Sequence, residues 1–309
     1  MTLNQLRVFR AVALTRNINS AARALFVTQP SVSMQLKALE TDLKVSLYER
    51  RQGQVVLTEA GHILLRYAET ILAAEEEATR AMASLRGVLL GTLRIGTNIT
   101  GGMYVAPSMI RSYRDSHPEV EVTLAIDTSP RIMDSILQGT LDIALIGGPV
   151  DKARFEVETV GYDELTMIVS PSHRFAPRSF IAIDELAEEN IILPGIGSRS
   201  RWLLESILKE KGLAVKSALT MTGTEEVKKA VESNLGVGFV SRYAIKRELL
   251  DSTLIRIDIS GLTIKRDLEL FWKKNQEIPG LAVPFRDNAR HVLIREAAEN
   301  GIATLDTKA

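Results

Sequence analysis

A helical face with hydrogen-bonding groups and no carboxylate lies between residues 29 and 43. At about 100° per residue, the opposite stripe is apolar and predicted to be buried, and it consists of Val32, Leu36, Leu39 and Leu43. The outward residues are Gln29, Pro30, Ser31, Ser33, Met34, Gln35 and Lys37. Amide, hydroxyl and ammonium groups can bind base edges and phosphates in a DNA major groove, which admits one helix. On these residues alone, a solvated face in a small helical bundle is an equal alternative.

The segment before this helix indicates how the polar face is positioned. Apolar residues within 21–25 lie three and four apart, which predicts a short helix whose small alanines allow close packing. The spacing stops at Phe26, and we expect the Thr28 hydroxyl to cap the next helix, with Pro30 in its first turn. Two short helices joined by a tight turn form a helix-turn-helix.

A further helix is predicted at the start of the chain. Thr2 and Gln5 have the spacing of a capping box, in which each side chain bonds the other residue's backbone. The apolar residues expected to face the helix-turn-helix are Leu3, Leu6, Phe9 and Ala13. Together these elements predict a three-helix core.

A β-hairpin is predicted after the three helices. Residues 46–49 and 54–57 favour strands around a turn at Gly53, with Arg50 and Arg51 beside it. Residues 1–60 contain eight Arg and Lys against four Asp and Glu, a net charge of +4, whereas the whole chain is neutral. A basic N-terminal region therefore precedes an acidic body, as expected where cations contact a phosphate backbone.

The most specific motifs of the N-terminal part are Gln29, Pro30, the 31–35 segment, the hairpin and the LTEAG that follows it. With these motifs, the N-terminal part resembles LysR-type transcriptional regulators. The resemblance implies a winged helix-turn-helix at 1–58, a linker helix at 59–87 and an effector-binding domain at 91–309. It also implies a double-stranded DNA operator, a small-molecule effector, and a dimer that pairs into a homotetramer, and it leaves RNA polymerase as a candidate partner.

One residue departs from the family pattern. Many members carry Arg where this chain has Met34. Apolar contact with a thymine methyl group is a substitute that methionine can make. The Ser-Met-Gln-Leu-Lys segment is also similar to regulators of carbon dioxide fixation and of inorganic-anion metabolism.

A long helix is predicted from Thr58, which caps it, to an end at Arg86-Gly87. Its apolar residues alternate at spacings of four and three, as a coiled-coil seam requires, and they are Ala60, Leu64, Tyr67, Ile71, Ala74, Ala78, Ala81 and Leu85. The helix would be roughly 40 Å long at about 1.5 Å per residue. We expect it to pair two chains; the alternative is an amphipathic helix that packs only on its own domain.

The remaining chain alternates short apolar runs with helix-length segments. The first three strands of this part of the chain are expected to start at Leu93, Val120 and Leu141. The pattern predicts an α/β domain with a parallel sheet. A second set of strands is expected at 165–169, 190–193, 218–221 and 236–241, a further strand from Arg266, and a closing helix at 281–299.

About 220 residues suffice for two such lobes. The family resemblance implies a periplasmic-binding-protein-like fold, with lobe 1 at about 91–161 and 266–300 and lobe 2 at about 162–265. The chain would cross between the lobes near Tyr162 and return near Lys265.

Ligands in open α/β sheets bind beyond the carboxyl ends of the strands. Hydroxyls, free N–H groups and helix N-termini gather at four such ends and favour a small anion. The predicted effector residues, several of them matched to the family's effector sites, are Asn98, Ile99, Thr100, Thr128, Ser129, Gly147, Ser198, Arg201 and Thr222. Arg199 is a further source of positive charge. For any one hydroxyl, a simple capping role is the competing interpretation.

The sequence has no cysteine, and its four histidines are far apart, so neither thiol chemistry nor a histidine metal site is expected. Without an enzyme signature, no catalytic residue, metal or cofactor is predicted. The N-terminus lacks a signal-peptide pattern and no apolar run is long enough to span a bilayer, so we expect a cytoplasmic protein with no membrane partner. The alternatives are a solute-binding protein of a transport system and an enzyme on the same two-lobed scaffold.

Overall fold

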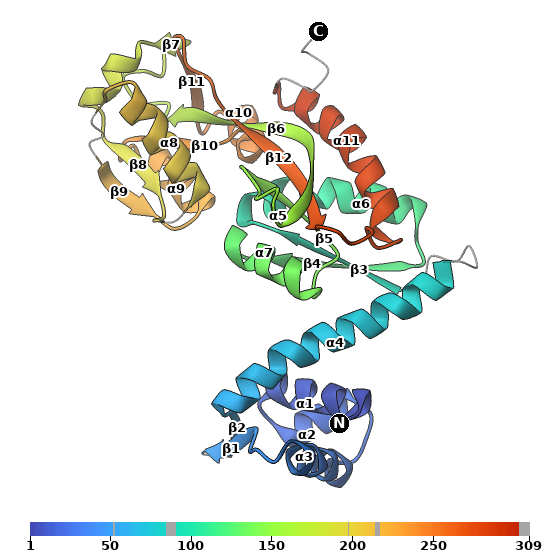
Figure 1. The fold of residues 1–309 in the computed structure, drawn as a ribbon. Helices are drawn as coiled ribbons and strands as arrows, with labels where there is room; N and C mark the ends of the chain where they lie inside the picture. Colours follow the sequence, from blue (N-terminus) through green and yellow to red (C-terminus); the bar gives the residue numbers. More distant parts are fainter. Residues whose placement is uncertain (52, 85–90, 197, 214–216, 303–309) are drawn as a thin grey trace. The chain divides into compact units, whose positions relative to one another are not determined.

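The computed structural model describes residues 1–51, 53–84, 91–196, 198–213 and 217–302 (Figure 1). The chain divides into two compact units, Met1–Gly91 with Asp134–Leu141, and Thr92–Met133 with Asp142–Ala309. None of the helices in the described ranges is long and apolar enough to cross a membrane.

The N-terminal domain has the predicted order of helices and strands. Its elements are α1 (Leu3–Thr15), α2 (Ile18–Ala24), α3 (Gln29–Leu43), β1 (Tyr48–Arg51), β2 (Gln54–Leu57) and α4 (Glu59–Ser84). The capping box is confirmed, because the Gln5 backbone N–H donates to Thr2 Oγ1 and the Thr2 N–H donates to Gln5 Oε1. The hairpin is also confirmed, with Tyr48 paired to Leu57 and Arg51 to Gln54.

Three local predictions for this domain are wrong. Thr28 occupies the N-cap of α3, but its side chain makes no capping hydrogen bond. Leu43 is exposed because the helix ends there, one residue before Lys44 takes a left-handed conformation. Leu3 is exposed as well, because it lies at the first position of α1, whereas Leu6 and Phe9 are buried.

The helix α4 begins where the sequence predicted. The Gly61 N–H donates to Thr58 Oγ1 over 3.0 Å, which confirms the cap. One face of the first half of α4 is buried, since Ala68 and Leu72 pack against Leu6 of α1. The predicted end of the helix, including Leu85, lies outside the described residues.

The second unit contains a two-lobed α/β domain, of which only Gly91 and Asp134–Leu141 are grouped with the first unit. Lobe 1 is built from β3 (Gly91–Thr97), α5 (Ile99–Tyr104), α6 (Ala106–Ser116), β4 (Val120–Ile126), α7 (Ser129–Gln138), β5 (Ile143–Gly147) and α11 (Ala282–Glu299). Lobe 2 is built from β7 (Phe180–Ile181), β8 (Ile191–Pro194), α8 (Arg199–Glu210), β9 (Ser217–Met221), α9 (Thr224–Glu232), β10 (Val237–Ser241), α10 (Lys246–Leu250) and β11 (Ile255–Ile259).

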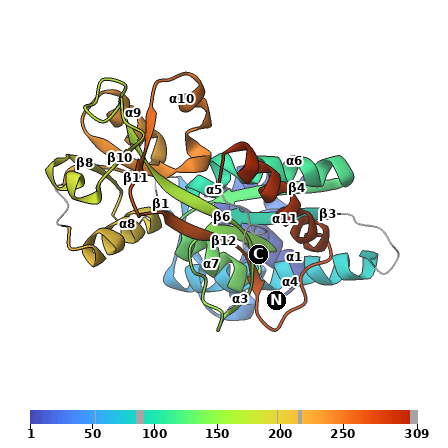
Figure 2. The same ribbon diagram turned by 90° about the horizontal axis from the view of Figure 1, so that it is seen from above.

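Two long strands, β6 (Phe155–Val169) and β12 (Ile264–Lys273), run through both lobes (Figures 1 and 2). The strand order is β4-β3-β5-β12-β6-β10-β8-β9. β12 pairs with β5 at Leu268–Phe271, and β6 pairs with β10 at Leu165–Ile168. The stretch of sheet that joins the lobes lies between these pairings, where Lys265 faces Glu164 and Asp267 faces Tyr162.

The prediction of a parallel sheet is only partly right. β3 with β5, β8 with β9, and β8 with β10 are parallel, but β12 is antiparallel to both β5 and β6, and β6 is antiparallel to β10. β6 also begins ten residues before the predicted Leu165. Its first part carries acidic residues, including Glu156 and Glu158, so no apolar run marks it in the sequence.

Candidate functional site

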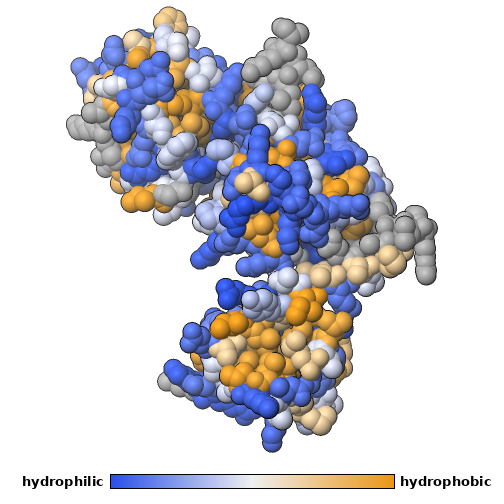
Figure 3. Space-filling view, viewed as in Figure 1, coloured by the Kyte–Doolittle hydropathy of each residue, from blue (hydrophilic) through white to orange (hydrophobic). Residues whose placement is uncertain are grey.

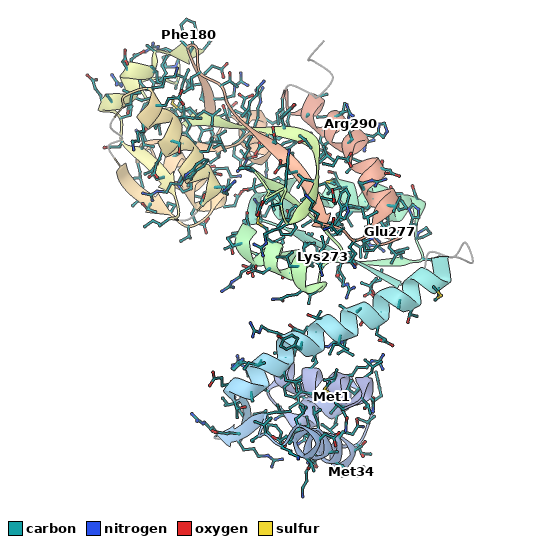
Figure 4. The ribbon with its side chains drawn as sticks, in the orientation of Figure 1. Met1, Met34, Phe180, Lys273, Glu277 and Arg290 are labelled. Atoms are coloured by element: carbon teal, nitrogen blue, oxygen red, sulfur yellow. The ribbon has the colours of Figure 1, made fainter. Side chains whose placement is uncertain are left out.

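The outward face of α3 is exposed as predicted. Val32, Leu36 and Leu39 are fully buried, so the helix is held in one orientation by its apolar stripe. Pro30, Met34 and Lys37 are exposed on the other side, and the side chain of Met34 points outward from the helix (Figure 4). The face contains no acidic side chain, so the helix can enter the major groove of DNA with this face toward the bases.

Two glutamines on α3 have different surroundings. Gln29 is exposed, and its amide donates to Ser33 Oγ over 3.4 Å, so the two side chains share one helix face. Gln35 is half-buried, and its Oε1 accepts a 2.8 Å hydrogen bond from Asn4 of α1. Gln29 is therefore free to meet a base edge, whereas Gln35 also anchors α3 to α1.

The hairpin places both predicted arginines on strand β1. Gly53 adopts a φ of +79°, which a glycine accommodates without a side-chain clash. Arg51 donates to Glu49 Oε2 over 2.8 and 3.0 Å, so its charge is partly balanced within the strand. Arg50 is exposed and makes no hydrogen bond or ion pair with another described residue. It is the stronger candidate for a phosphate contact.

Part of the predicted seam on α4, from Tyr67 to Ala78, is open to solvent in the single chain, whereas Ala60 and Leu64 are half-buried and pack against the N-terminal core. Tyr67 is 62% exposed and Ile71 37%, and Ala74 and Ala78 are exposed as well. A row of weakly hydrophobic residues follows this helix on the visible face (Figure 3). The seam residues from Tyr67 to Ala78 are available to a second copy of the helix, because the cluster that packs on α1 contains Leu64, Ala68 and Leu72 but none of these.

Two of the predicted effector residues cap helices. Asn98 Oδ1 accepts from the Gly101 N–H over 2.9 Å at the start of α5. Ser198 Oγ accepts from the Arg201 N–H over 3.4 Å at the start of α8. Among the described residues, the hydroxyls of Thr100, Ser129 and Thr222 make no hydrogen bond, and Ile99 is exposed beside Thr100.

Two other predicted residues meet partners that the sequence did not indicate. The Thr128 N–H donates to Asp127 Oδ1 over 2.7 Å, so a carboxylate already occupies the start of α7. Arg201 donates to Glu205 over 2.8 Å and to the Pro194 carbonyl over 3.4 Å, both within lobe 2. Positive charge toward a ligand must therefore come from another residue.

Gly147 has a steric role next to a buried arginine. A Cβ at this position would lie 2.8 Å from Arg266 Nε, so only glycine leaves room for the guanidinium. Arg266 donates to Asp163 Oδ2 from Nε over 2.9 Å and from Nη2 over 2.5 Å, and both side chains are at most 5% exposed. Its Nη1 donates to Ser200 of α8 over 3.0 Å. This network joins β6, β12 and α8 where the two lobes meet.

Arg199 also connects the lobes. Its Nη2 donates to the Pro149 carbonyl over 3.1 Å, beside Gly148 at the end of β5, while its guanidinium lies over the Trp202 ring. One hydrogen bond leaves other N–H groups of the guanidinium available to an anion. Among the described residues, Arg199 thus has more unused donors than Arg201, whose Nε and Nη1 are both engaged.

A third connection between the lobes uses a buried lysine. Tyr104 of α5 donates to Glu225 of α9, which also pairs with Lys228 over 2.6 Å. Lys228 is only 3% exposed and bonds Glu248 over 2.7 Å. Burial, reinforced by Glu225, raises the pKa of Tyr104 far above its usual value, so the phenol keeps its proton and remains a donor.

Sequence reasoning missed these connecting residues. Asp163 and Arg266 are charged positions in strands of otherwise mixed polarity, and only the pairing of β6 with β12 shows that they meet. Lys228 follows Val227 in the amphipathic helix α9, where a solvated lysine would be the usual expectation. A buried charge of this kind is recognised only once its partner is known.

Comparison with known proteins covers both domains. Residues 3–62 match the model of the bacterial regulatory helix-turn-helix protein, lysR family, and residues 86–293 match the LysR substrate binding domain. The chain is 37% identical over 275 residues to a probable RuBisCO transcriptional regulator of Cyanidium caldarium, which is 87% of each chain.

The chain also resembles solved structures of other proteins. Full-length CbnR in complex with its target DNA superposes with a TM-score of 0.71 at 23% identity, covering 94% of this chain and 100% of that one. The regulatory domain of Synechocystis PCC6803 CcmR in complex with 2-PG has a TM-score of 0.61 at 22% identity, covering 66% of this chain and 97% of that one.

Proposed function

The chain belongs to the LysR family of transcriptional regulators, and we propose from this that it binds a specific operator under the control of a small anion held between its lobes. The observation that carries the DNA-binding part is the exposed, acid-free face of α3 next to the arginines of the hairpin. The proposed DNA contacts are the residues predicted from the sequence, and Gln29, Lys37 and Arg50 are the exposed polar ones among them that are not paired with an acidic side chain in the described residues.

Replacing Arg50 with Ala tests the phosphate contact. Each neutralised phosphate releases counterions, so the slope of log affinity against log salt should fall by about one, and binding should weaken on all sequences. Fluorescence anisotropy with labelled DNA over a salt series measures this slope. Arg247→Ala removes an exposed arginine of lobe 2 and should leave the slope unchanged. If Arg50→Ala also leaves the slope unchanged, Arg50 does not contact phosphate.

The anionic character of the effector is supported by the donors near the meeting of the lobes. Arg199 lies at the N-terminus of α8, and among the described residues its guanidinium has unused N–H groups and the hydroxyls of Thr100 and Thr222 make no hydrogen bond. A ligand that bonds α5 on one side and α8 on the other would favour one arrangement of the lobes. Only such a difference in affinity between arrangements can shift the protein's conformation.

A Thr100→Val variant tests this site while keeping the side-chain shape. Its affinity for 2-PG, the ligand in the CcmR complex, should fall by about 1–3 kcal/mol, because a hydrogen bond to the anion is lost. Calorimetric titration measures the change, and Thr253→Val on the surface of lobe 2 is the control. An unchanged affinity for 2-PG, or a loss of DNA binding without ligand, would instead make Thr100 a structural residue.

Two further parts of the proposal concern the target genes and the assembly. Similarity to RuBisCO transcriptional regulators supports a role in regulating carbon fixation. The open seam of α4 supports a dimer, which would present two recognition helices to paired half-sites about one helical turn apart. We propose that two dimers form a homotetramer and that RNA polymerase is contacted from the operator.

A further inference from the structure

The turn of the helix-turn-helix displays an aromatic residue entirely in solvent. Phe26 is 96% exposed, and Val27 next to it is 42% exposed. Exposed apolar residues are common on proteins, but a phenylalanine with almost no contact to its own domain contributes nothing to the core. Its ring is therefore unlike Phe9, which is buried in the same domain.

The backbone at Phe26 is also of a kind that disfavours a bulky side chain. Its φ is +55°, in the left-handed region. The Phe26 N–H donates to the Arg23 carbonyl and the Val27 N–H to the Ala22 carbonyl, which together form a Schellman motif at the end of α2. Glycine is the usual residue at this position, and asparagine is the next choice, because a large side chain is strained there.

Phe26 differs from the other residues of this chain that adopt a positive φ. The other described non-glycine residues with positive φ are Arg16, Lys44, Asn234, Ser252 and Asn275, all of them polar. Phe26 therefore combines backbone strain with an exposed ring, and neither is compensated within the domain. A partner that covers the ring would compensate both.

The position of Phe26 indicates which partner this is. It lies three residues before Gln29, the first residue of α3, and residues 26–30 form one exposed run that continues into the polar face of that helix. The N-terminal residues of a recognition helix are those that meet base edges in the major groove. The apolar groups available there are thymine methyls and the C–H edges of deoxyribose.

We propose that Phe26 is a DNA-contact residue that packs its ring against the apolar surface of the operator at the entry of α3 into the groove. This inference rests on the proposed operator binding. It explains why a strained, exposed phenylalanine stands where glycine would serve the fold better. On this proposal, the residue that weakens the free domain strengthens the complex.

Phe26→Gly in the full-length protein separates the two effects. Removing the ring should lower affinity for a selected operator about tenfold, which corresponds to about 1.4 kcal/mol. The same change relieves the left-handed strain, so the thermal unfolding temperature should equal or exceed that of the wild type. Phe26→Asn should behave in the same way. A residue with a structural role would instead lower the unfolding temperature when it is replaced.

Matched variants and DNAs identify the contact. Phe26→Tyr keeps the ring and should retain affinity within about twofold, whereas Leu14→Ala removes another exposed apolar side chain, 68% exposed, and should change nothing. Operator DNA with uracil in place of thymine lacks the methyl groups. If uracil and Phe26→Gly give non-additive losses, the ring packs on a methyl group; if they are additive, it packs on deoxyribose.

Full operator affinity in Phe26→Gly and Phe26→Asn would overturn the proposal, and would indicate instead that Phe26 contacts a protein partner. That result is distinguishable from a failure of the proposed function, because Arg50→Ala would still reduce the salt slope. If the wild-type protein did not prefer any DNA sequence, both proposals would fail together.

Discussion

An Asp163→Asn variant is expected to lose about 3–5 kcal/mol in the free energy of unfolding of the effector-binding domain, because it leaves the Arg266 charge buried without its partner. Both side chains of this pair are at most 5% exposed. Solvent therefore cannot replace the lost carboxylate. Urea unfolding followed by tryptophan fluorescence measures the change, since both tryptophans, Trp202 and Trp272, lie in this domain.

An exposed ion pair in the same domain provides the control. Lys246 and Glu299 are 2.7 Å apart, but their side chains are 49% and 50% exposed. Lys246→Gln should therefore cost less than about 1 kcal/mol. If Asp163→Asn were as mild as this control, the Asp163–Arg266 pair would not hold the joining strands together.

Ile71→Asp is expected to raise the dissociation constant of the dimer about a hundredfold or more, because the seam of α4 would bury an unpaired carboxylate. Ile71 is 37% exposed in the single chain, and the buried face of α4 is formed by other residues. The monomer should therefore stay folded. Analytical ultracentrifugation at low micromolar concentration measures the association.

His62→Asp adds the same charge on the opposite side of α4, where His62 is exposed, and should leave the dimer intact. Tryptophan fluorescence of the effector-binding domain should be unchanged in both variants. Sedimentation of Ile71→Asp as the wild-type assembly would show that the seam does not pair two chains.

Elements with a local cause followed from the sequence. The capping box at Thr2 and Gln5, the Thr58 cap and the apolar stripe of α3 depend on residues three or four positions apart, and the structure has each of them except for Leu43 at the end of the stripe. The failure at Thr28 shows the limit of the same reasoning, because residue type indicates that a cap is available but not that the side chain turns toward the helix.

Features that depend on distant residues could not be predicted in this way. The antiparallel course of β6 and β12 brings Asp163 within 2.5 Å of Arg266, 103 residues later in the chain. Tyr104 and Glu225 are separated by 121 residues. The charged residues at the meeting of the lobes are thus set by topology, and hydropathy patterns contain no signal for them.

The most direct measurement of operator control is the affinity of the full-length protein for a double-stranded DNA selected from a random pool, compared with a shuffled sequence at one salt concentration. We predict a preference of at least about a thousandfold, as is usual for specific regulators. Addition of the small anion should shift the operator affinity or footprint and leave binding to the shuffled sequence unchanged. Equal affinity for the selected and shuffled DNA would contradict sequence-specific regulation by this protein.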